Sequence, residues 1–273
     1  YLEDLTFWDR KNTSIEVGRG AVYELIERLR LEGRRMKNTR LITIGHSFGA
    51  SVMLSITKNE VYRDLIQDRA EVRADGANSL EPLTILINPA IEALHFLPLY
   101  ELPEETARID AGKYARPRAP RIAVFMSEAD SATKVFFRLG RVVSTAFESH
   151  NPVVRLNRRG EPVSFSEFQM DTQALGHYTP FVTHTLSVTT PNTRVTQCEP
   201  DFSNWRDHLV DASMSEGWQA RFQVSDTTLS HQRNSPAFSP VWVVKVANNI
   251  IGNHNDIWDQ RFNCFLEELV LTR

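Results

Sequence analysis

The sequence of 273 residues lacks most of the features that would place it in a specialised class of protein. It has only two cysteines, Cys198 and Cys264, which are too few for a disulfide framework and need not pair at all. No apolar run approaches the roughly 18 to 20 residues of a membrane-spanning helix, and no basic leader with an apolar core stands at the start. These absences exclude a transmembrane segment and leave a cytoplasmic location as the default.

The chain also has no large excess of positive or negative charge. The net charge is −3 at pH 7, and no basic stretch is long enough to contact nucleic acid. Apolar residues make up 41% and charged residues 24% of the chain, which is typical of an ordinary globular protein with a substantial core. We therefore expect no nucleic-acid partner.

What the chain does contain is a series of short β-rich apolar runs separated by helical patterns. This order is typical of a doubly wound α/β sheet, in which ligands bind at the carboxyl edge of the strands. In chain order we expect a helix over 17–31, a strand over 41–44, a helix from 50 to beyond 56, strands over 83–87, 121–126 and 241–246, and a closing helix from about 258 to 271.

The segment 131–240 differs from the rest of the chain in composition and in hydrophobic pattern. It is rich in Ser, Thr, Asn and Pro, has scattered aromatic residues and shows no clear periodicity. Loops of such length are seldom structureless inside a compact domain. We therefore predict one domain over 1–273 with a core formed by 1–130 and 241–273, and an inserted cap or lid over 131–240 with weak strands near 181–189 and 219–224.

The strongest motif is Gly45-His46-Ser47-Phe48-Gly49, which matches G-x-S-x-G between an expected strand and an expected helix. A serine on such a sharp turn has its hydroxyl lifted clear of the sheet, and small residues two positions away on either side avoid collisions. The helix N-terminus favours negative charge, so the Phe48 N–H is a candidate oxyanion donor. We predict that Ser47 is a nucleophile, and that His46 lines the site or supports the structure.

A serine nucleophile needs a histidine base and a carboxylate that orients the base, in the chain order Ser, acid, His. Of the later histidines, His254 alone lies in a polar loop between the last expected strand and the closing helix. Asp130 follows the strand over 121–126, and we prefer it as the acid on strand order. Glu128 and Glu92 remain alternatives, whereas Asp256 is too near His254 to orient it and is expected to tether the loop or cap the closing helix.

These residues resemble the α/β-hydrolase superfamily, and they look closest to microbial esterases and lipase-like hydrolases. The resemblance rests on the segments 45–49, 5–11, 88–90 and 252–257 and on the strand that leads to Asp130. It implies an α/β-hydrolase-type sheet, a triad of Ser47, Asp130 and His254, and an ester or related acyl substrate. No cofactor is needed for that chemistry.

In that superfamily several strands precede the nucleophile, and an early loop supplies the second oxyanion donor. Only 40 residues precede Leu41 here, and the chain starts at Tyr1. We therefore expect an N-terminally truncated version of the fold, with the strand over 41–44 at or near an edge of the sheet. A truncated front also makes a non-catalytic binding module with a vestigial site an alternative function.

A metal hydrolase is the second enzymatic alternative. His177 and His184, with Asp171 nearby, could supply ligands, but their spacing matches no metal-binding motif. We predict no metal.

Overall fold

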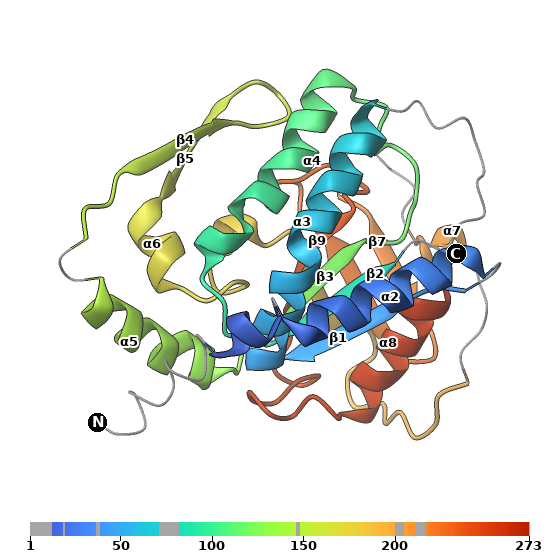
Figure 1. Ribbon diagram of the computed structural model, residues 1–273. Coiled ribbons are helices and arrows are strands. Elements are labelled where there is room, and N and C mark those ends of the chain that lie inside the picture. Colours follow the sequence, from blue (N-terminus) through green and yellow to red (C-terminus); the bar gives the residue numbers. More distant parts are fainter. Residues whose placement is uncertain are drawn as a thin grey trace.

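The computed structural model describes residues 13–18, 20–36, 39–70, 82–145, 148–199, 205–210 and 217–272 (Figure 1). A mostly parallel sheet of seven strands lies between helices, an α/β arrangement. The strand order across the sheet is β1-β2-β3-β9-β6-β8-β7. Within the described ranges, no helix has both the length and the apolar character needed to cross a membrane.

The four strands expected from the apolar runs form one half of the sheet. They are β1 (Ile42–His46), β2 (Leu83–Ile87), β3 (Ile122–Ser127) and β9 (Val241–Val246). All four are paired in parallel. Among the described residues β1 pairs with β2 alone, so the expectation that it lies at an edge is confirmed.

Helices cover both faces of this parallel half. Alternate strand residues such as Leu86, Val124 and Val243 pack with α3 (Phe48–Ala70) and α4 (Leu97–Ile109). The residues between them, such as Phe125 and Val244, pack with α8 (Gln260–Leu271) on the opposite face. Because both faces of β2, β3 and β9 are covered, these strands read as continuous apolar runs, which is why the sequence revealed them.

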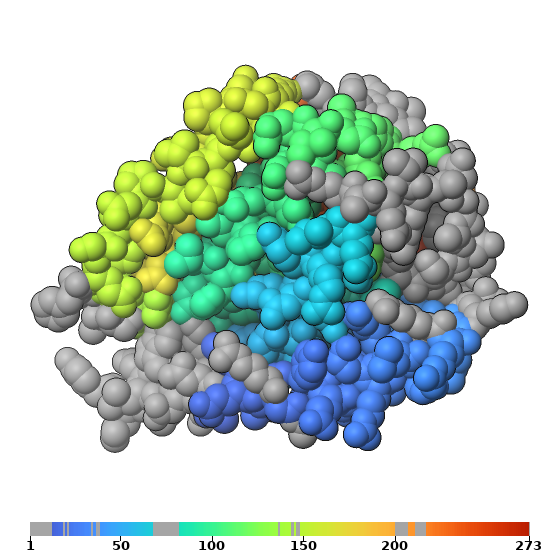
Figure 2. Space-filling view, turned by 45° about the horizontal axis from the view of Figure 1, so that its top comes forward, coloured from blue at the N-terminus to red at the C-terminus, as the bar shows by residue number. Residues whose placement is uncertain are grey.

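The N-terminal helical region differs from the single helix expected over 17–31. Residues 13–18 form one helical segment, and α2 (Ala21–Arg35) forms the next. Glycine weakens a helix interior, and Gly18 also lies against α3: a Cβ there would be 2.0 Å from the Ser55 Oγ. Figures 1 and 2 show α2, α3 and α4 side by side on one face of the molecule.

The segment 131–240 does not act only as a cover over the sheet. Its strands β6 (His184–Val188), β8 (Thr227–His231) and β7 (Gln219–Phe222) extend the sheet beyond β9. β6 is parallel to β9, and β8 is antiparallel to both of its neighbours, β6 and β7. The two weak strands expected near 181–189 and 219–224 are therefore present, but they belong to the central sheet rather than to a separate cap.

Another part of this segment lies beside α4. A hairpin of β4 (Pro152–Leu156) and β5 (Pro162–Ser166) forms a separate two-stranded sheet. It is the yellow-green ribbon next to α4 in Figure 1 and the yellow-green surface beside the green one in Figure 2. The short helical elements are η1 (Ala93–Phe96), the π-helix η2 (Ala132–Phe136), α5 (Phe137–Ser144), α6 (Glu167–Thr172), η3 (Thr179–Phe181) and α7 (Trp205–His208).

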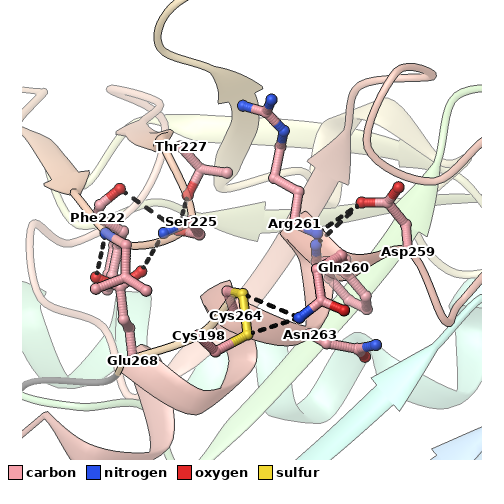
Figure 3. Close-up of a disulfide and its surroundings, with 12 residues drawn as sticks. Cys198, Phe222, Ser225, Thr227, Asp259, Gln260, Arg261, Asn263, Cys264 and Glu268 are labelled. Carbon is pink, nitrogen blue, oxygen red and sulfur yellow. Dashed lines mark hydrogen bonds between the residues drawn. A yellow bond between two sulfur atoms is a disulfide. The ribbon is translucent and has the colours of Figure 1, made fainter. Parts of the chain in front are cut away.

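A disulfide joins Cys198 to Cys264 on α8, with a Cα–Cα distance of 5.2 Å (Figure 3). The Gln260 amide contacts both sulfur atoms, at 3.1 Å and 3.6 Å. The sequence left this pairing open. The bond fastens the part of segment 131–240 that follows β6 to the closing helix.

Candidate active site

Ser47 lies on the tight turn between β1 and α3 with a left-handed backbone conformation, at φ 53°. A non-glycine residue rarely adopts that conformation, which costs about 1 to 3 kcal/mol and marks a strained turn. Phe48, the next residue, begins α3. The motif therefore occupies the strand-to-helix turn expected from the sequence.

The two glycines of the motif have different roles. A Cβ on Gly45 would lie 2.5 Å from the Gly49 carbonyl oxygen and 2.7 Å from the Ala50 Cα, so only glycine fits there. A Cβ on Gly49 would meet nothing within 4 Å. The steric argument made from the sequence is thus right for Gly45 and wrong for Gly49.

The end of β2 holds the turn in place. The Ser47 N–H donates to the Ile87 carbonyl at 3.1 Å, and the Ala90 N–H donates to the Ser47 carbonyl at 3.3 Å. One helical turn further, the Ser51 hydroxyl donates to the Ala90 carbonyl at 3.0 Å. These bonds satisfy the backbone of a strained residue and fix the direction of its side chain.

The three side chains singled out from the sequence lie in one hydrogen-bonded row. His254 Nε2 is 2.9 Å from Ser47 Oγ, and His254 Nδ1 is 2.8 Å from Asp130 Oδ2. The Asp130 side chain is fully buried, whereas the His254 side chain is 19% exposed. This is the geometry in which an imidazole can accept a serine proton while a carboxylate fixes its tautomer.

The electrostatics of Asp130 favour its ionised form. Burial raises the pKa of the carboxyl, but hydrogen bonds from His254 and Thr133 outweigh that effect and hold the pKa below its usual value. The Thr133 hydroxyl donates to Oδ2 at 2.5 Å, and the Thr133 N–H donates to Oδ1 at 3.1 Å. A carboxylate therefore faces His254 at neutral pH.

The alternative acids point elsewhere. The Glu92 carboxylate is buried and pairs with Arg141 at 3.3 Å and His95 at 3.5 Å. Glu128 pairs with Lys245 at 3.0 Å on the surface. Asp130 is thus the carboxylate that contacts His254. Asp256 accepts a hydrogen bond from the Gly252 N–H at 3.1 Å and so tethers the loop, as expected.

Side chains at the ends of three neighbouring strands hold the backbone of the His254 loop. Asn88, which follows β2, donates to the His254 carbonyl at 2.9 Å and accepts from the Ser127 N–H at 2.9 Å. The Ser127 hydroxyl, at the end of β3, donates to the Ile251 carbonyl at 2.6 Å. The buried Asn88 amide therefore links the strand that carries the acid to the loop that carries the base.

His46, at the end of β1, provides the third contact. Its Nε2 lies 2.8 Å from the His254 carbonyl, and the two imidazole rings are 4.9 Å apart. Burial lowers the pKa of His46, so the ring is neutral at pH 7 and the Nε2–H form donates to that carbonyl. His46 supports the loop and does not contact Ser47 as a base would.

The ligands considered for a metal are not brought together. His184 is fully buried on β6, His177 lies beside Thr133, and the Asp171 carboxylate is bonded by Arg141. A different trio, Glu148, His150 and Asp171, has donor atoms within 4.8 Å of one another. The Arg141 guanidinium on Asp171 already neutralises the buried member of that trio.

Sequence reasoning missed Asn88, Ser127, Thr133 and His177 as parts of this site. Asn88 offered the clearest signal, because a polar residue that directly follows a buried parallel strand lies at the edge of the sheet where ligands bind. Thr133 offered a weaker one, since a threonine three residues after an acid can bond back to it. His177 offered no signal in the sequence, because it lies 47 positions after Asp130 and no local pattern connects the two residues.

No family model, no curated protein and no solved structure significantly matches this chain. The chemistry of the site therefore has to be argued from its own geometry.

Proposed function

We propose that this protein is a serine hydrolase of the α/β-hydrolase type that cleaves an ester or related acyl bond. The observation that carries the proposal is the row Ser47–His254–Asp130, with contacts of 2.9 Å and 2.8 Å, on a strained strand-to-helix turn. Residues 207 and 124 positions apart meet in the order that nucleophilic catalysis requires. A surface serine and a surface histidine have no reason to be so arranged.

The reaction follows from these contacts. His254 Nε2 accepts the Ser47 proton while the serine oxygen attacks the acyl carbonyl, and Asp130 stabilises the imidazolium that forms. The C–O bond to the leaving group then breaks, and His254 returns its proton to the departing alcohol. Water repeats the sequence with the same base, which releases the carboxylic acid and restores Ser47.

The oxyanion of the tetrahedral intermediate is assigned to the N-terminus of α3. The Phe48 N–H belongs to the first turn of this 23-residue helix, where the backbone dipoles favour negative charge. The Phe48 ring packs against a buried cluster formed by Ala90, Met126, Phe137 and Ala174.

A fluorophosphonate probe and a p-nitrophenyl ester test the proposal together. We expect the probe to label the wild type, and Ser47→Ala to abolish both labelling and ester cleavage, because the nucleophile is gone. Ser55→Ala is the matched control. Its hydroxyl donates to the Val52 carbonyl of the same helix at 2.8 Å and lies away from the Ser47–His254–Asp130 row, so labelling should persist.

Two outcomes would contradict the proposal. A wild-type protein that neither labels nor cleaves any acyl substrate would favour the non-catalytic binding module. Ester cleavage that a chelator abolishes, and that survives in Ser47→Ala, would favour a metal hydrolase.

A further inference from the structure

A loop of segment 131–240 reaches the acid side of the candidate site. The Leu175 N–H donates to the Ile91 carbonyl at 2.7 Å, and the Ala93 N–H donates to the Gln173 carbonyl at 3.0 Å. Gly176, at φ 93°, lets the loop approach β3, because a Cβ there would be 2.5 Å from the Met126 Cβ. The loop over 173–177 is thus fixed against the strand that leads to Asp130.

The residue delivered by this loop is His177. Its Nε2 lies 3.0 Å from the Thr133 hydroxyl, the same hydroxyl that donates to Asp130 Oδ2 at 2.5 Å. Burial lowers the pKa of His177 to about 4, although the nearby Asp130 charge opposes this effect. The ring is therefore neutral at pH 7 and carries one N–H.

The protons of this chain can be assigned. Thr133 has a single hydroxyl proton, and a carboxylate oxygen can only accept. Donation to a carboxylate is stronger than donation to a neutral imidazole, so the Thr133 proton points to Asp130. The Thr133 oxygen then accepts from the Nε2–H of His177. Bonds in such a chain polarise one another, which strengthens the contact with Asp130.

The geometry at Asp130 shows what the chain does. The Thr133 N–H binds Oδ1, and the hydroxyl binds Oδ2, so one residue contacts both oxygens of the carboxylate. Oδ2 is also the oxygen that faces His254 Nδ1. The N–H contact alone resembles an ordinary helix cap at the start of η2, but the hydroxyl contact exceeds what capping needs.

We propose that Thr133 and His177 are positioning residues, which lock the Asp130 carboxylate in the orientation that aims Oδ2 at His254. This inference rests on the proposed hydrolase function. It assigns to the loop over 173–177 a role in the chemistry, in addition to its role in the fold. Neither residue touches the nucleophile or the acyl group.

The test compares Thr133→Val, which removes only the hydroxyl, with Thr133→Ser, which retains it. A hydrogen bond to a charged group that is made best in the transition state supports an expected loss of about tenfold in kcat for Thr133→Val, with KM unchanged. The acid limb of its pH–rate profile, which reports protonation of the coupled His254–Asp130 pair, should move to higher pH, because a carboxylate that has lost a donor makes the pair hold its proton more strongly. Thr133→Ser should stay close to the wild type.

The control for a buried threonine hydroxyl is Thr106→Val. Thr106 lies on α4, and its hydroxyl bonds to the Leu102 carbonyl of the same helix at 2.7 Å. This variant should lose stability without any shift of the pH–rate profile. Thr133→Val with wild-type kcat and pH profile would overturn the inference, as would equal losses in Thr133→Val and Thr133→Ser.

His177 provides a second pair of variants, which tests the positioning role if Thr133→Val does not fold. His177→Phe removes the N–H that supports Thr133. It should lower kcat about threefold, a smaller loss than in Thr133→Val, because His177 acts on Asp130 only through Thr133. His177→Gln keeps a terminal N–H and should recover most of that loss. No difference between the two would contradict the inference. A wild type without Ser47-dependent turnover would instead remove the proposed function itself.

Discussion

The two ends of the seven-stranded sheet place a half-buried and a fully buried histidine in opposite surroundings. At the end formed by β1, β2, β3 and β9, His254 has a carboxylate on one ring nitrogen and a serine hydroxyl on the other. At the end formed by β6, β8 and β7, His184 is fully buried among Trp218, Trp242 and His231. Its Nδ1 contacts the Thr183 hydroxyl, and within the described residues its Nε2 has no hydrogen-bond partner.

This difference follows from the two kinds of strand pairing. Parallel strands end at the same edge, so His46, Asn88, Ser127 and Asp130 meet there around the His254 loop. The antiparallel strands point alternately in opposite directions, and their polar residues lie within the strands themselves. Burial lowers the pKa of His184 well below its usual value, so this histidine is a neutral part of the core. A buried histidine is therefore a candidate for catalysis only where its nitrogens have reactive partners.

The largest effect is expected at the parallel end, from Asp130→Asn. Loss of the carboxylate leaves the imidazole in the wrong tautomer, which lowers kcat by about 10⁴-fold in a serine triad. Glu92→Gln should change kcat little in protein that remains folded, because Glu92 pairs with Arg141 and His95. Steady-state kinetics of both variants measure the contrast. A larger loss of kcat in Glu92→Gln than in Asp130→Asn would contradict this prediction and would favour Glu92 as the acid.

A smaller effect is expected from the disulfide, which joins the segment after β6 to α8 on the parallel half. Cys198 and Cys264 close a loop of 66 residues, for which the chain-entropy estimate is about 4 kcal/mol of stability. The double change to serine should lower the midpoint of denaturant unfolding but leave kcat unaltered under folding conditions. Equal loss of kcat and stability would show that the two ends are not independent. The bond also weighs against the cytoplasmic default, because cytosolic thiols are normally kept reduced.

The smallest effect concerns acid stability. Burial lowers the pKa of His231 to about 4, below the ordinary value of 6.5. Between these values the unfolded chain binds a proton that the folded protein does not, so stability falls as the pH is lowered through this window. His231→Gln should remove about 2 kcal/mol of the stability difference between pH 7 and pH 5. Urea unfolding at the two pH values measures it, and an unchanged difference would mean that His231 is not the group responsible.

Sequence patterns predicted the parallel half well and the other half poorly. β2 and β9 coincide with the expected runs over 83–87 and 241–246 because strands covered on both faces are apolar throughout. β8 was not expected, since its Thr, Ser and His residues do not form an apolar run. α4 was also missed, because Pro103 lies inside it and obscures the helical pattern.

The sequence by itself determined the position of the strand-to-helix turn that carries Ser47, because a strand, a glycine that admits no Cβ and a helix start are encoded within a few consecutive residues. It also singled out His254 and Asp130, the residues that the structure brings into contact with each other. Only the tertiary structure decided that Asp130 rather than Glu92 faces His254, and that Asn88 and Thr133 support the pair. Those contacts join residues far apart in the chain, so they depend on how the strands pack side by side and not on any local pattern.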